Sequence, residues 1–259
     1  MNQSNNKGEL VVLGLFLAAA IFGGAYVASN AFYKVKALDS VISVTGSSQR
    51  KITSDTVKWR TSFTRTVGAD GLKSGNDTMK SDLALVVKFL KDSGVQDKDI
   101  TIKPMDMNTL YQSEGNGSGY YDKWGGGQIT SKIAGYTFRQ EIEINSNEID
   151  NITKLSQEAS TLVGQGIPFS TISLEYFYSK LSELRIEMLA EATKDAKARA
   201  EKIAESTGAK VDSLRSASMG VFQITTPNST EVSDYGMYDT SSIEKQITGI
   251  VRTSFSLKK

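Results

Sequence analysis

Three segments of the chain alternate apolar and polar residues with a period of two, as β-strands with one buried face do. They span residues 57–64, 136–144 and 251–257. In the first segment, Val57, Trp59 and Phe63 share one face, and the intervening residues are polar or basic. Shorter candidate strands span residues 41–45, 100–107, 170–178 and, in one or two pieces, 210–224. Strands of this kind favour an antiparallel sheet with one solvated face.

Three other segments repeat their apolar residues at steps of three and four, which predicts amphipathic helices. They span residues 72–90, 147–166 and 181–207. Each ends at or just before a glycine, a residue that commonly caps a helix C-terminus. The third helix carries Ala192, Ala196 and Ala200 in its apolar stripe. Their small side chains would let this helix approach a sheet closely.

The predicted elements follow the order ββ-α-ββ-α-β-α-ββ. Segments with a strand period and segments with a helix period therefore share one stretch of chain, residues 39–259. This order predicts an α+β domain in which three helices pack on antiparallel sheets.

An uninterrupted apolar run from Leu10 to Ser29 precedes this domain. About 20 apolar residues are needed to cross a bilayer core. We therefore interpret residues 10–29 as a transmembrane anchor, residues 1–9 as a cytoplasmic tail and residues 30–38 as a linker. The run is longer than an ordinary secretory core, which favours an uncleaved anchor, although Ser29-Asn30-Ala31 offers a cleavage site as the alternative. The short tail and the large domain predict a single-pass protein of the inner membrane with its domain in the periplasm.

Composition removes most catalytic chemistry, because the chain contains no His and no Cys. Triads that need His and sites that need a thiol or thiolate are excluded. Thirty Lys and Arg residues balance 29 Asp and Glu residues, so no broad positive field attracts nucleic acid. We expect no enzyme, no cofactor, no metal and no nucleic-acid partner.

Six short segments, in their order and spacing, carry a family resemblance. They are the strand VISVTG at 41–46, the Gly94-Val95 turn before Asp99-Ile100, the strand start Ala134-Gly135-Tyr136, the alanine-rich helix from Ala190 to Val211, the tripeptide Phe222-Gln223-Ile224 and the closing strand GIVRTSFSLK. With these marks, residues 41–258 resemble the SIMPL domain family of bacterial envelope proteins, a domain of unknown function.

The resemblance implies an α+β domain outside the cytoplasm, large homo-oligomers in some members, and a loose link with envelope integrity and oxidative stress. It implies no established reaction, so no catalytic residue is transferred to this chain. We expect a non-enzymatic, membrane-anchored protein of the cell envelope with a structural or scaffolding role and a tendency to self-associate. The alternative is an extracytoplasmic ligand-binding or sensing domain, or an enzyme that needs neither His nor Cys.

A glycine-rich segment, residues 113–128, departs from the plain family pattern and carries Tyr120, Tyr121 and Trp124. Its glycine spacing does not match a dinucleotide-binding fingerprint. Tyr and Trp are favoured contact residues, so these three side chains form a candidate interaction loop for a neighbouring subunit, peptidoglycan or lipid. A disordered or self-packed hairpin loop is the alternative. The polar loop at 228–242 carries two further tyrosines and suggests the same role with less force.

Two pairs match the local spacing of a Ser-Lys nucleophile, Ser48 with Lys51 and Ser242 with Lys245. Such a lysine acts as a base only where burial removes its proton, typically at the start of a buried helix. The sequence places neither pair there, so we expect no catalysis from them.

Glu141 and Glu143 project from one strand face and could together bind a hard cation. Arg139 lies on the same face, which favours the simpler interpretation that these residues form the wet side of a sheet.

Overall fold

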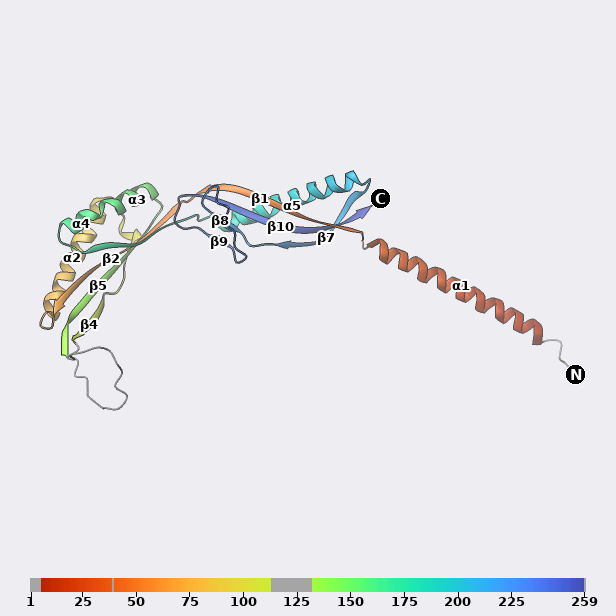
Figure 1. The fold of residues 1–259 in the computed structure, drawn as a ribbon, viewed down its shortest axis with the longest axis horizontal. Helices are drawn as coiled ribbons and strands as arrows, with labels where there is room; N and C mark the ends of the chain where they lie inside the picture. The colour runs from red at the N-terminus through yellow and green to blue at the C-terminus, as the bar shows by residue number, and fades with distance from the viewer. Residues whose placement is uncertain (1–5, 39, 113–131, 259) are drawn as a thin grey trace, which may run out of the picture.

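The computed structural model describes residues 6–38, 40–112 and 132–258. Two antiparallel sheets lie end to end, each with helices on one face, and α1 extends from the end where β1 begins (Figure 1). We call the sheet nearer to α1 the proximal sheet and the other the distal sheet. The long strand β1 (Val41–Thr53) belongs to the proximal sheet, and β2 (Thr56–Gly68) belongs to the distal sheet. Only Ser54 and Asp55 separate the two strands, so the chain passes directly from one sheet into the other. The predicted α+β class with antiparallel sheets is confirmed.

The helix α1 (Asn6–Leu38) contains one stretch, Val11–Phe32, that is long and apolar enough to cross a membrane. None of this stretch is buried against the rest of the protein. Its position near the N-terminus fits an anchor or a signal sequence. Residues 30–38, predicted as a linker, continue the same helix, since they include neither Gly nor Pro to end it.

The proximal sheet is built around β10 (Glu244–Lys258), which pairs with β1 along its whole length. On its other side β10 pairs with β7 (Lys210–Met219) and then β8 (Gln223–Thr225), and the two-residue β9 (Met237–Tyr238) pairs with β8. The helix α5 (Leu181–Ser206) packs on one face, mainly over β1 and β10.

The backbones of α5 and β1 lie in direct contact. Ala192, Ala196 and Ala200 are fully buried, and Gly46 of β1 faces the first two of them. A Cβ atom on Gly46 would lie 2.1 Å from the Ala192 carbonyl oxygen. The alanine stripe and this glycine together set the distance between helix and sheet.

The distal sheet is built around β5 (Lys132–Ser146). It pairs with β2 on one side and with β3 (Ile100–Ile102) and β4 (Asp106–Gln112) on the other, while β6 (Phe169–Phe177) pairs with the far side of β2. One face is covered by α2 (Leu72–Asp92), α3 (Ile149–Glu158) and α4 (Ser160–Gly164), and a short 3-10 helix (Asp97–Asp99) precedes β3.

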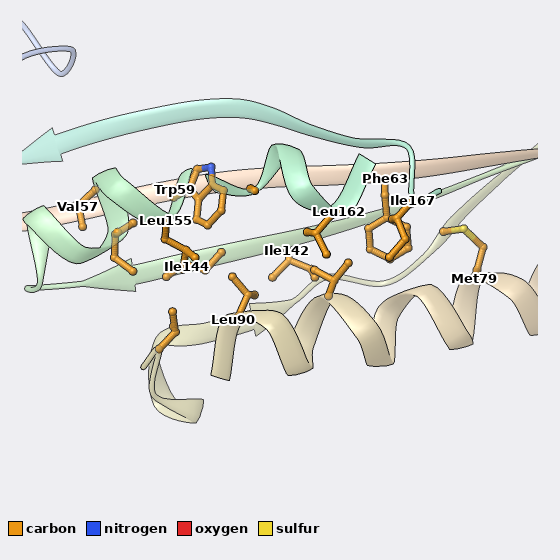
Figure 2. Packing of buried hydrophobic residues seen from close by; sticks show 14 of the residues in the cluster. Val57, Trp59, Phe63, Met79, Leu90, Ile142, Ile144, Leu155, Leu162 and Ile167 are labelled. Atoms are coloured by element: carbon orange, nitrogen blue, oxygen red, sulfur yellow. The ribbon is translucent and has the colours of Figure 1, made fainter. Parts of the chain in front are cut away.

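The alternation seen in the sequence defines the distal core. Val57, Trp59 and Phe63 are fully buried and point toward the helices (Figure 2). They meet apolar residues from β5, α2, α3 and α4 in one cluster. The Trp59 indole N–H donates a hydrogen bond to the Thr171 hydroxyl at 3.1 Å, so its only polar atom is satisfied.

The predicted order of elements differs from the structure in three places. The helix predicted at 147–166 is divided into α3 and α4, beside serines whose hydroxyls bond back to the carbonyls of Thr153 and Gln157. The strand predicted at 100–107 is divided into β3 and β4, because Pro104 has no N–H for the ladder. The stretch predicted at 210–224 in one or two pieces forms the two strands β7 and β8, whereas the short β9 has no counterpart in the prediction.

Candidate functional site

The predicted interaction residues Tyr120, Tyr121 and Trp124 lie outside the residues that the structure describes, so that hypothesis stays a prediction. In the second loop, Tyr235 is 96% exposed and Tyr238 is 40% exposed. The two tyrosines of the polar loop at 228–242 are therefore accessible to a partner, as the second interaction-loop hypothesis requires.

Glu141 and Glu143 lie on the open face of β5, and each is already paired with basic side chains of the protein. Glu143 contacts Lys58 at 3.2 Å and Lys103 at 3.7 Å, and Glu141 contacts Arg139 at 3.2 Å. A hydrogen bond from Asn145, followed by the nearby lysines, lowers the pKa of Glu143. These carboxylates form a charge network on the solvated face, as the simpler interpretation predicts. Within the described ranges, no cluster of three or more acidic side chains could hold a metal ion.

Ser48 and Lys51 do not form a pair. They are three residues apart on β1, so their side chains point to opposite faces. The Ser48 hydroxyl is buried and donates to the Met188 carbonyl oxygen at 2.9 Å, whereas Lys51 is exposed.

Lys245 is buried, contrary to the expectation from the sequence. None of its side chain is exposed, and burial lowers the pKa of its ammonium group while Asp239 opposes that shift. The Lys245 Nζ donates to the backbone oxygens of Asp239 and Ser242 at 2.6 and 2.5 Å and lies 3.6 Å from the Asp239 carboxylate. The ammonium group therefore donates to two backbone oxygens and forms an ion pair with the carboxylate. This arrangement holds a charged lysine and leaves no lone pair to activate the Ser242 hydroxyl.

Asp239, Ser242 and Lys245 together form a cluster that we call the buried node. Burial alone would raise the pKa of Asp239, but hydrogen bonds from Ser242 and Ser241 and the charge of Lys245 lower the pKa to about 2. The node fixes the turn before β10, and the backbone of this turn bonds to both sheets. Thr240 O accepts from Tyr176 N of β6 at 2.8 Å, and Asp239 N donates to Ile224 O of β8 at 2.9 Å. Ile243 O also accepts from Ser54 N, between β1 and β2, at 2.9 Å. The Ser-Lys spacing thus marks the junction between the sheets.

A second contact fastens the same junction. Asp55, between β1 and β2, accepts hydrogen bonds from the backbone N and the hydroxyl of Ser179 at 2.8 and 2.7 Å. Ser179 lies between β6 and α5, the other crossing from the distal to the proximal sheet. Both crossings are therefore fixed by charged side chains.

The strand β7 is the least covered element of the proximal sheet, and no sequence pattern predicted this exposure. Nine of its ten residues are exposed. Leu214 pairs with Phe255 and Met219 pairs with Val251, and both partners on β10 are buried. Leu214 and Met219 nevertheless remain 50% and 55% exposed, since α5 contacts β7 far less than it contacts β1 and β10.

These features define a class of protein: an α+β domain of two antiparallel sheets that follows a candidate membrane helix. The family model of SIMPL, a protein of unknown function (DUF541), matches residues 42–249. The match includes strands of both sheets and all the helices of the domain, so the chain belongs to the SIMPL family. A search of the curated proteins found no match.

Proposed function

We propose that this chain is a membrane-anchored, non-enzymatic structural or scaffolding protein of the bacterial envelope, and that its copies associate through β7. In this proposal α1 is an uncleaved anchor in the inner membrane, and the SIMPL domain lies on the periplasmic side.

The observation that carries the proposal is the exposure of β7. Leu214, Ala217 and Met219 pair with β10 residues that are buried on the helix side of the sheet, yet all three are exposed. Among the described residues, β7 has a strand partner only on its β10 side. An open edge beside exposed apolar side chains is a surface that proteins normally cover.

A second copy of this chain fits that surface. Two β7 strands can pair antiparallel about a two-fold axis, which extends the proximal sheet and closes both open edges. The strand carries Lys210, Asp212 and Arg215, so it has charges of both signs and no strong self-repulsion. Membrane anchoring would raise the local concentration of copies and so favour a weak contact.

The non-enzymatic part of the proposal is supported by chemistry. The sequence has no His and no Cys, and the buried Lys245 donates to two backbone oxygens and is paired with the Asp239 carboxylate. A structural role uses the sheets as they are, whereas a catalytic role needs a reactive group that these residues do not supply.

The test compares Leu214→Lys with Ile186→Lys in the full-length protein in mild detergent. Both changes place a lysine on an exposed apolar position, but Ile186 is 71% exposed on α5, half a turn from the buried Leu184 and Met188. We expect light scattering after size exclusion to show oligomers for the wild type and for Ile186→Lys. Leu214→Lys should weaken association at least tenfold, about 1.4 kcal/mol.

A monomeric wild type at all concentrations would remove the assembly proposal. Oligomers that survive Leu214→Lys but dissociate with Ile186→Lys would move the interface from β7 to α5.

A further inference from the structure

A hollow of about 520 Å³ opens between α5 and the β7–β9 side of the proximal sheet. Its size falls in the range of sites for small ligands. Apolar and aromatic side chains line it beside Arg185, Gly220 and Gly236, and they are those of Met219, Val221, Phe222, Tyr235, Met237 and Tyr238. The hollow is therefore suited to a molecule with an apolar body.

Arg185 of α5 is the one charged side chain among the described residues that line the hollow. Its guanidinium carbon lies 5.6 Å from the centre of the Phe222 ring. The neighbours three and four positions away on the helix are Leu181, Ser182, Met188 and Leu189, none of which is acidic. No ion pair to Arg185 occurs in the described part of the chain, so the wall carries a positive charge without a partner.

The Phe222 ring and the turn beside it are held in place by the surrounding structure. Gly249 of β10 makes room for the Phe222 ring, because a Cβ atom there would lie 2.6 Å from it. The Gln223 amide donates to the Ser233 carbonyl oxygen at 2.6 Å and accepts from the Ser233 N–H at 3.4 Å. This brace fixes the turn that leads to Gly236, whose φ is +86°. A preformed wall lowers the entropy cost of binding.

We propose that this hollow binds a small carboxylate with an aromatic or other apolar body. The body packs against Phe222 and the methionines, and the carboxylate pairs with the Arg185 guanidinium. Stacking on a ring uses the face of a guanidinium and leaves its N–H edge free for a charge-assisted hydrogen bond. The site disfavours cations, since the wall has no carboxylate to receive them. Met219 at the end of β7 lines the hollow and also belongs to the proposed β7 interface, whereas Arg185 and Phe222 lie outside β7.

The test uses the full-length protein in nanodiscs of zwitterionic lipid, with 3-phenylpropionate as the probe and ligand-observed NMR as the readout. Empty nanodiscs measure partition of the probe into lipid. The neutral 3-phenylpropanamide and the cationic 3-phenylpropylamine have nearly the same shape and differ in charge. We expect saturable binding of the acid that is at least about tenfold tighter than binding of the amide or the amine.

Two arginine variants separate this site from general attraction by positive charge. Arg185→Gln should weaken binding of the acid at least about tenfold and leave the amide unchanged. Arg215→Gln removes another exposed arginine, on β7 outside the hollow, and should leave both affinities within about twofold. Gly249→Ala should displace the Phe222 ring and weaken the acid and the amide together.

Three results would overturn the proposal. They are no saturable binding of the acid up to about 10 mM, equal affinity for acid and amide in the wild type, and equal losses in Arg185→Gln and Arg215→Gln. Repeating the titration with Leu214→Lys, which opposes β7 pairing, shows whether the hollow binds its ligand independently of assembly.

Discussion

Replacing Lys245 by Met should destabilise the domain strongly. Met is close to Lys in volume and fills the same buried space, so the change removes chiefly the ammonium group. Two backbone oxygens, those of Asp239 and Ser242, then lose their donor. The Asp239 carboxylate, 14% exposed, loses its counter-charge.

The magnitude follows from these contacts. Removing one member of a buried ion pair costs about 3–5 kcal/mol, because the remaining charge is left without compensation. Asp239 keeps hydrogen bonds from Ser241 and Ser242, which places Lys245→Met near the lower limit, at about 3 kcal/mol. For a domain of this size, each kcal/mol shifts the melting temperature by about 2–4 °C. The expected decrease is therefore about 6–12 °C.

The assay is thermal unfolding of the full-length protein in detergent, followed by near-UV circular dichroism. Lys51→Met is the matched control, since Lys51 is exposed on β1 and lies next to Lys245 in the sheet, opposite Gln246. That variant should melt within about 2 °C of the wild type. If Lys245→Met also stays within 2 °C, the buried node does not stabilise the junction and the reasoning is wrong.

Two further predictions concern pH and packing. The pKa of Asp239 is about 2 when folded, against 3.8 for the free side chain, so its contribution of about 2 kcal/mol is present above pH 4 and lost as the pH falls toward 2. The difference in melting temperature between wild type and Asp239→Asn should therefore shrink over that range, and a constant difference would contradict it. Gly46→Ala should lower the melting temperature by at least about 4 °C, because its Cβ meets the backbone of α5, while Gly68→Ala, where the space is open, should not.

Periodicity predicted the parts of the fold that local burial determines. The alternation of Val57, Trp59 and Phe63 located β2 and one wall of the distal core. The steps of three and four residues located α2 and α5 within a residue or two of each predicted end. In each case one face of the element is buried along its length, so the periodic pattern of apolar residues can be recognised within that segment alone.

The candidate sites depend on contacts between distant residues, which no local pattern contains. We expected the Lys245 ammonium group to stay hydrated, because no buried helix begins there. It is buried instead, and backbone oxygens of the preceding turn replace water as its hydrogen-bond acceptors. No sequence pattern singles out Arg185, and only the fold places its guanidinium over the Phe222 ring. The strand at β7 was predicted, but its exposure depends on how much of the sheet α5 covers.

The anchor and the exposed strand support one another in the proposed assembly. Three peptide steps separate the end of α1 at Leu38 from the start of β1 at Val41, so the proximal sheet begins within about 10 Å of the helix. The 13 residues of β1 then span about 40 Å before the chain enters the distal sheet. Copies anchored in one membrane would hold their proximal sheets at the same height, with β7 edges at one level. A contact too weak to form between freely diffusing domains could then be sufficient, because the membrane has already aligned the two surfaces.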